Sequence, residues 1–69
     1  MMNFDELWEQ VEGLSDMTKR LVPDALTAST KKKLERKKPK DIEQIVLSAI
    51  DEVNCGSVIS LDELIRKRL

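Results

Sequence analysis

The sequence predicts an all-α fold, a small bundle of three to four short helices around a central helix at about residues 39–54. The first observation behind this prediction is that apolar residues recur at the spacing of one helix face in several segments. The second is that residue types that begin and end helices flank those segments. The third is size, because 69 residues with 36% charged side chains suit one domain of short amphipathic helices. We therefore expect residues 1–69 to form a single small helical domain.

The first helix is expected over residues 3–13. Its apolar face follows the spacing i, i+3, i+4, i+7 and i+10 through Phe4, Leu7, Trp8, Val11 and Leu14. Asn3 is a good N-cap, because its side chain can accept a hydrogen bond from the first turn. Gly13 is a natural end for this helix.

A second, shorter helix is expected over residues 16–22, with Met17 and Leu21 on its inner face. It has to end by Val22, because a proline disfavours helical geometry at the residue before it and Pro23 follows.

The next segment is expected to begin as a loop over residues 27–30, with either Ser29 or Thr30 as the cap of the next helix. That helix is expected over residues 31–38. Residues 27–40 are therefore either a basic linker or a segment with one short helix.

The central helix is expected over residues 39–54. Its apolar stripe consists of Ile42, Ile45, Val46, Ala49, Ile50 and Val53. Leu47 lies beside this stripe and widens the apolar face. Pro39 at the start and Gly56 just past the end follow the usual asymmetry of helix termini.

A last helix is expected over residues 61–68. Ser60 followed by Glu63 forms a capping box, in which the two residues satisfy each other's free backbone N–H groups. The basic residues near its end, Arg66, Lys67 and Arg68, favour a helix C-terminus.

The charges of the chain are strongly segregated although the net charge is only −1. Residues 31–40 contain seven basic residues and one acidic residue, so this segment carries +6. Residues 1–30 carry −4 and residues 41–69 carry −3. The basic segment is therefore the most distinctive feature of the sequence.

A basic segment of this kind can bind the phosphates of nucleic acids, with an affinity that depends on salt. The candidate residues are Lys31, Lys32, Lys33, Arg36, Lys37, Lys38 and Lys40. A helical segment would place four of them on one ridge, namely Lys33, Arg36, Lys37 and Lys40. No aromatic, Asn or Gln lies among them to stack on or read bases, so binding would be largely independent of sequence. The alternatives are a solvated linker that balances the acidic flanks, and a site for an acidic protein partner.

The C-terminal third of the chain resembles the opening half of a winged-helix domain. The pattern covers residues 42–69 through Ile45, Ala49, Ile50, Val53, Gly56, Ser57, Val58, Ile59, Ser60, Leu61, Asp62, Glu63, Leu64, Ile65 and Leu69. The resemblance implies a helix, a short strand at 58–59, and a second helix that opens with a serine cap. The family's recognition helix and wing would follow Leu69, so no base-reading residue carries over. A plain helical bundle produces the same apolar spacing.

The second candidate function is a protein–protein interaction module, such as an adaptor, an inhibitor or an accessory subunit, that uses an apolar helix face. Its candidate contact residues are Trp8, Leu47 and Ile59. The alternative for Trp8 is a place in the core together with Phe4. A homodimer would suit a chain with so small a core, because it would bury more apolar surface.

Composition argues against an enzyme and against a bound cofactor. The chain has no His and one Cys, Cys55, so it lacks the usual zinc, haem and iron–sulfur ligand sets and the residues of a Cys–His pair or a Ser–His–Asp triad. It also has no apolar run of the ~20 residues that a membrane span requires, and its first residues are acidic where a signal peptide is basic. We therefore expect a cytoplasmic protein with no membrane association.

Overall fold

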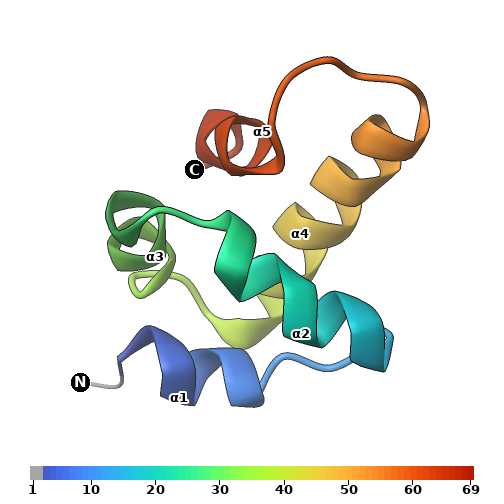
Figure 1. Cartoon of the computed structure of the whole chain (residues 1–69). Coiled ribbons are helices and arrows are strands. Elements are labelled where there is room, and N and C mark those ends of the chain that lie inside the picture. Colours follow the sequence, from blue (N-terminus) through green and yellow to red (C-terminus); the bar gives the residue numbers. More distant parts are fainter. Residues whose placement is uncertain (1–2) are drawn as a thin grey trace.

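The computed structural model describes residues 3–69, so the first two residues of the predicted domain lie outside the described part. Within this range the chain forms five helices and no strand, which confirms the predicted all-α class. The helices, labelled in Figure 1, are α1 (Phe4–Glu9), α2 (Asp16–Ala25), α3 (Ala28–Leu34), α4 (Pro39–Asn54) and α5 (Leu61–Lys67).

The core forms around α4, the longest helix, whose bounds agree with the prediction. Its buried face consists of Ile42, Val46 and Ala49, all fully inaccessible to solvent. Helix α5 packs against α4, and α3 contacts both α1 and α5 (Figure 1). The other helices complete the core with Phe4, Leu7, Trp8, Val22, Leu34, Leu64 and Ile65.

Helix α1 ends at Glu9, four residues earlier than the sequence predicts. Its expected inner face is nevertheless buried as far as Val11, which follows the helix as part of the connection to α2. Gly13 has a φ of +81°, and the carboxylate of Glu43 from α4 occupies the space that a Cβ atom would need. Gly13 therefore allows the backbone to turn between α1 and α2, and it does not mark the end of α1.

Helix α2 corrects the prediction about Pro23. The helix continues through this proline and ends at Ala25 instead of Val22. A proline inside a helix leaves the carbonyl four residues earlier without its usual N–H donor, and here that carbonyl belongs to Lys19. The indole Nε1–H of Trp8 donates to the Lys19 oxygen at 2.8 Å. A tertiary hydrogen bond thus compensates for the bond that the proline removes.

The inner face of α2 was also predicted wrongly. Met17 is 71% exposed and Leu21 is 57% exposed, whereas Val22 is buried. Leu26 just beyond the helix is buried as well, and Thr18 is half-buried. The buried positions follow an i, i+4, i+8 series that starts at Thr18. The helix therefore turns this side toward the core, and the side with Met17 and Leu21, which was expected to face inward, faces solvent.

Helix α3 begins earlier than predicted, and residues 27–30 are not a loop. Thr27 is the N-cap, and its hydroxyl oxygen accepts a hydrogen bond from the backbone N–H of Thr30 at 3.4 Å. Thr30 itself is fully buried inside the helix. The helix ends at Leu34, so the expected helix over 31–38 is shorter at its C-terminal end and is followed by a turn.

The helix–strand–helix segment implied by the winged-helix resemblance is wrong, because the described residues contain no strand. Helix α4 closes with two backbone bonds, Gly56 N–H to Val53 O and Ser57 N–H to Glu52 O, which form a Schellman motif around the positive φ of Gly56. Val58 then points into solvent and is fully exposed. Since residues 3–69 form no strand, this short β-branched stretch has no partner there for strand pairing.

The predicted start of the last helix is confirmed. The Ser60 side chain accepts a hydrogen bond from the Glu63 N–H at 3.4 Å, which is the serine half of the expected capping box. Helix α5 then ends at Lys67, one residue before the predicted end.

Candidate nucleic-acid interface

The structure divides the basic segment 31–40 among different parts of the surface. The cause is the break between α3 and α4, because the ten residues belong to a helix end, a turn and the start of a second helix. The single ridge of four basic residues expected from an unbroken helix is therefore not formed.

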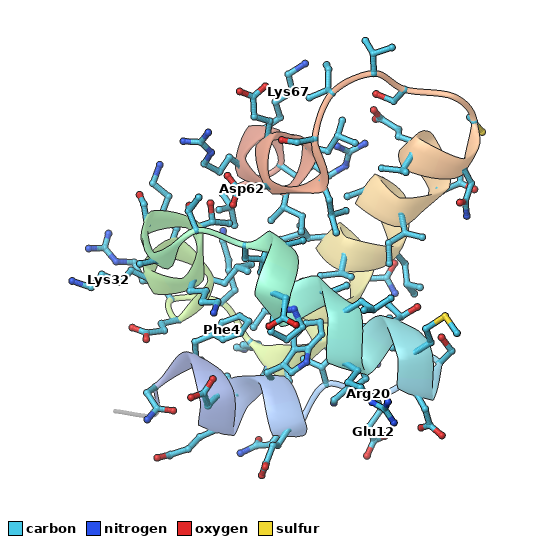
Figure 2. All side chains as sticks on the ribbon, viewed as in Figure 1. Phe4, Glu12, Arg20, Lys32, Asp62 and Lys67 are labelled. Atoms are coloured by element: carbon cyan, nitrogen blue, oxygen red, sulfur yellow. The ribbon has the colours of Figure 1, made fainter. Side chains whose placement is uncertain are left out.

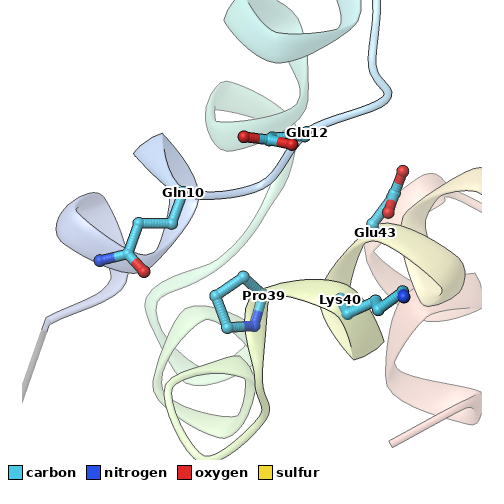
Figure 3. A pocket seen from close by; sticks show the side chains of 5 residues that line it. All are labelled: Gln10, Glu12, Pro39, Lys40 and Glu43. Atoms are coloured by element: carbon cyan, nitrogen blue, oxygen red, sulfur yellow. The ribbon is translucent and has the colours of Figure 1, made fainter.

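Lys40 is separated from the other members of that ridge. It lies at the start of α4 beside a hollow that is also lined by Gln10, Glu12, Pro39 and Glu43 (Figure 3). The carboxylates of Glu12 and Glu43 thus line the same hollow as the ammonium group of Lys40. The surroundings of Lys40 are acidic on balance and do not suit a phosphate.

Lys31 and Lys32 lie on the side of α3 that meets α1. The Lys31 ammonium lies 5.6 Å from the centre of the Phe4 ring, so its side chain packs against α1 and is half-buried. The Phe4 N–H also donates to Glu35 Oε1 at 3.0 Å, which fixes a carboxylate next to these lysines. Lys32 extends away from the protein (Figure 2).

Lys33, Arg36 and Lys37 form the third group, and they are the members of the expected ridge that stay together. Backbone bonds from Arg36 N–H to Lys33 O and from Lys37 N–H to Leu34 O continue the winding of α3 through the following turn. The three side chains therefore share one side at the spacing i, i+3, i+4. This side faces α5.

Helix α5 adds two further cations to this third group. Two adjoining hollows between α3 and α5 share Lys33 and Arg66 as lining residues. We call the surface that lines both hollows the basic groove, and its basic residues are Lys33, Arg36, Lys37, Arg66 and Lys67. Glu63 and Leu69 line it as well.

The two sides of the basic groove are held together by Asp62, which lies between α5 and α3 in Figure 2. Its Oδ1 accepts the backbone N–H of Thr27 at 2.9 Å and the Thr27 hydroxyl at 3.3 Å. Its Oδ2 lies 3.2 Å from Nε of Arg66, one helix turn later. Asp62 thus links the N-terminal end of α3 to a cation of the groove.

The Asp62 carboxylate is buried and ionised. Burial by itself raises its pKa, but the hydrogen bonds from the Thr27 N–H and from the Thr30 hydroxyl, the charge of Arg66 and the Thr27 hydroxyl lower it. The lowering effects together prevail, so the pKa of Asp62 lies below its ordinary value. Asp62 therefore stays negative at neutral pH and orients Arg66.

Within residues 3–69, no acidic side chain neutralises the other cations of the groove. In the part of the chain that the structure describes, Lys33, Arg36, Lys37 and Lys67 form no ion pair with an acidic side chain. Arg66 is the exception, because it also lies 4.0 Å from Glu63. The groove consequently carries a net positive charge that an anion can use.

Two further basic residues, Arg68 and Lys38, lie outside the basic groove. Arg68 is bound to α4 and α5, since it pairs with Glu52 and donates to Ser48 Oγ at 3.0 Å and to Leu64 O at 2.9 Å. Lys38 is the exposed N-cap residue of α4, and its side chain makes no capping bond.

Sequence reasoning missed the two cations that α5 contributes to the groove. It interpreted Arg66 and Lys67 only as favourable charges at a helix C-terminus. Their charge was visible, but their proximity to Lys33 depends on the packing of α5 on α3. A local pattern does not carry that information.

The apolar candidates have different environments. Trp8 is 6% exposed and stacks on Phe4 with 5.7 Å between ring centres, so it lies in the core. Ile59 is partly buried against the core, and Leu47 is exposed. Sequence reasoning missed the exposed apolar residues of α2, where Met17 and Leu21 line a hollow together with Asp16 and Arg20.

Comparison of the chain with protein-family models, with curated proteins and with solved structures gave no match. Among residues 3–69, no helix combines the length and the apolar character needed to cross a membrane. The same residues contain no group of three or more His, Cys, Asp or Glu side chains arranged to hold a metal ion.

Proposed function

We propose that this chain is a small non-enzymatic binding or regulatory protein that docks its basic groove on the phosphates of a nucleic acid. The observation that carries the proposal is the meeting of two groups of cations from distant parts of the sequence. Lys33, Arg36 and Lys37 come from α3 and its turn, and Arg66 and Lys67 come from α5. Cations on an exposed groove attract phosphates and release the counterions bound to them.

The acidic remainder of the chain supports docking in one orientation. The overall net charge is −1, so the protein as a whole is not attracted to a polyanion. Acidic residues dominate α1 and the surface around Lys40, where Glu12 and Glu43 line the hollow. Repulsion at these surfaces and attraction at the groove would restrict contact to the groove.

The residue types in the groove favour binding with little sequence preference. It offers Lys and Arg side chains, which contact phosphates and can also pair with guanine, and no Asn or Gln to pair with adenine. Any base preference would therefore be limited to guanine. Phosphate contacts position a protein on nucleic acid without reading its sequence. With about four phosphate contacts, the affinity for duplex DNA is expected to fall about a hundredfold between ~50 mM and ~200 mM salt.

The test is an NMR amide-shift titration of labelled protein with a generic DNA duplex and with a single-stranded RNA, at both salt concentrations. Shifts should concentrate at residues 33–37 and 66–67 and weaken with salt. The informative variant is Lys33→Gln with Lys37→Gln, which removes two charges from the groove. Its matched control is Lys32→Gln with Lys40→Gln, which removes two exposed charges from the same basic segment but outside the groove.

The groove variant should lose most of the binding, and the control should lose much less. Equal losses in the two variants would show that overall charge, not the groove, drives binding, and would contradict the proposal. Absence of any shift at ~50 mM salt would also overturn it.

A second candidate function, a protein–protein interaction module, is supported by the exposed apolar residues of α2. Met17 and Leu21 are one helix turn apart and are both largely exposed beside a hollow. Self-association of two copies is the first case to test, by sedimentation equilibrium of the native chain and of Met17→Ser with Leu21→Ser. A native chain that stays monomeric at ~0.5 mM would exclude the homodimer.

A further inference from the structure

Both aromatic side chains of the protein are buried in its core. The sequence contains one Phe, one Trp and no Tyr. Phe4 is 4% exposed, and it stacks on Trp8, whose indole N–H is already bound to Lys19 O. No aromatic ring is therefore available at the basic groove as a platform for an unpaired base.

Proteins that bind single strands depend on such platforms. Stacking of a base on an aromatic side chain contributes about 1–3 kcal/mol per base, in addition to the attraction of the phosphates. Arginine can replace an aromatic ring, because its planar guanidinium also stacks on bases. Of the two arginines that line the groove, Arg66 is held by Asp62 at 3.2 Å and by Glu63 at 4.0 Å. Arg36 is the guanidinium left to stack on a base, and one such contact is less than the successive platforms that single-strand binding uses.

With so little stacking available, binding depends mainly on charge density. A DNA duplex carries one negative charge per about 1.7 Å of its axis, twice the density of one of its strands. The cations of the groove also lie on two elements, with Lys33 and Lys37 on one side and Lys67 on the other. Cations that come from two elements can contact phosphates of two different strands at once, and a single strand offers only one.

We infer that the ligand of the basic groove is a double-stranded nucleic acid, bound through the phosphates of both strands in preference to a single strand. The inference rests on the proposed function and adds the class of nucleic acid. With about four contacts at ~50 mM salt, the difference between the duplex and single-strand charge effects corresponds to an affinity about tenfold higher for the duplex.

The experiment is a fluorescence-anisotropy titration with a labelled DNA duplex of ~20 base pairs and with each of its strands alone, chosen so that neither strand folds. The same three titrations with RNA of that sequence determine which polymer provides the duplex. About tenfold tighter binding to the duplex at ~50 mM salt, in DNA or in RNA, is the expected result.

The variant Lys67→Gln tests the use of both sides of the groove, with Lys32→Gln as the control. Lys67→Gln should weaken duplex binding by about three- to tenfold and single-strand binding by less, because one phosphate contact contributes more to the binding of a duplex than to that of a single strand. Equal or tighter binding to single strands in both polymers would overturn the inference but leave the proposed function intact. An unchanged duplex affinity in Lys67→Gln would overturn docking through cations of both elements. Absence of binding to every probe would overturn the proposed function as well.

Discussion

The indole Nε1–H of Trp8 donates to the backbone oxygen of Lys19 at 2.8 Å, and this oxygen is the one that Pro23 leaves without its helical donor. The Lys19 side chain reinforces the same contact, because its ammonium donates to Val11 O and lies 5.5 Å from the centre of the Trp8 ring. The connection joins α1, the turn after it and α2. It explains how α2 continues past a proline that by itself predicts a helix end.

The variant Trp8→Phe tests this relationship. It keeps an aromatic ring in the core but removes the N–H donor, so the Lys19 carbonyl loses its partner in a partly buried site. An unsatisfied group of this kind costs about 1–3 kcal/mol, and the smaller ring adds a packing loss. We expect the free energy of unfolding in urea to fall by at least about 1 kcal/mol.

A double-mutant cycle with Pro23→Ala separates the two effects. In that background residue 23 has an N–H that can bond to the Lys19 oxygen, so the hydrogen-bonding part of the Trp8→Phe effect should shrink while the packing part remains. An identical loss in both backgrounds would show that the indole N–H does not replace the missing proline donor.

The sequence was sufficient for those parts of the fold that depend on local patterns. The bounds of α4 and the start of α5 follow from apolar spacing, from Pro39 and Gly56 at the helix ends, and from the serine cap. The end of α2 could not be predicted, because a proline in sequence gives no sign of a tryptophan eleven residues before Lys19 that can bind the freed carbonyl. Tertiary contacts overrode the local preference there.

The two glycines provide the second prediction. Gly13 and Gly56 both have positive φ, at +81° and +94°. An alanine in this conformation costs about 1–2 kcal/mol. Gly56→Ala should show this effect alone, because no atom lies within 4 Å of the added Cβ. Gly13→Ala should cost more, since the Glu43 carboxylate also has to move.

Thermal unfolding of both variants, alone and combined with Glu43→Ala, measures this difference. The extra loss in Gly13→Ala should disappear when Glu43 is shortened, and the loss in Gly56→Ala should not change. Equal losses for the two glycine variants would mean that Glu43 moves away without cost.

The candidate site was predictable only in part. The sequence identified the cations of residues 31–40, and the expected unbroken helix would have placed Lys40 on the same ridge as Lys33. In the structure the turn before Pro39 separates the two lysines, and they line different hollows. The contribution of Arg66 depends on Asp62, a residue to which the sequence analysis assigned no role in the site. Its contact with Thr27, 35 residues away, arises from the packing of α5 on α3.

The third prediction concerns the stability that Asp62 provides. Asp62→Asn keeps the size of the side chain and one oxygen that can accept the Thr27 N–H, but it removes the negative charge that pairs with Arg66 and strengthens that hydrogen bond. Hydrogen bonds to a charged group contribute about 1.5–3 kcal/mol. We expect a loss of about 1–3 kcal/mol in urea unfolding at pH 7, with Glu63→Gln, an exposed carboxylate in the same helix turn, as a nearly neutral control. Equal losses in the two variants would contradict the role of Asp62 as the link between α3 and α5.

The fourth prediction is the pH dependence of that stability. Burial raises the pKa of Asp62, but its hydrogen bonds and the charge of Arg66 lower the pKa by more than burial raises it. The folded pKa therefore lies below the value of about 3.9 expected in the unfolded chain. A carboxyl group with a lowered folded pKa stabilises the fold above its unfolded pKa and loses this effect as pH falls through the folded value. The difference in unfolding free energy between the native chain and Asp62→Asn should therefore be constant between pH 7 and about 5 and shrink below about 4.

Urea unfolding of both chains at pH 7, 5, 4 and 3 measures this difference. The other carboxyl groups titrate in both chains and cancel in the comparison, so the remaining pH dependence belongs to Asp62 and the groups it contacts. The Glu63→Gln control should follow the native chain at every pH more closely than Asp62→Asn does. A difference that stays constant down to pH 3 would mean that Asp62 has the same pKa in the folded and unfolded chain. In that case the contacts with Thr27 and Arg66 would stabilise the neutral side chain as well as the ionised one.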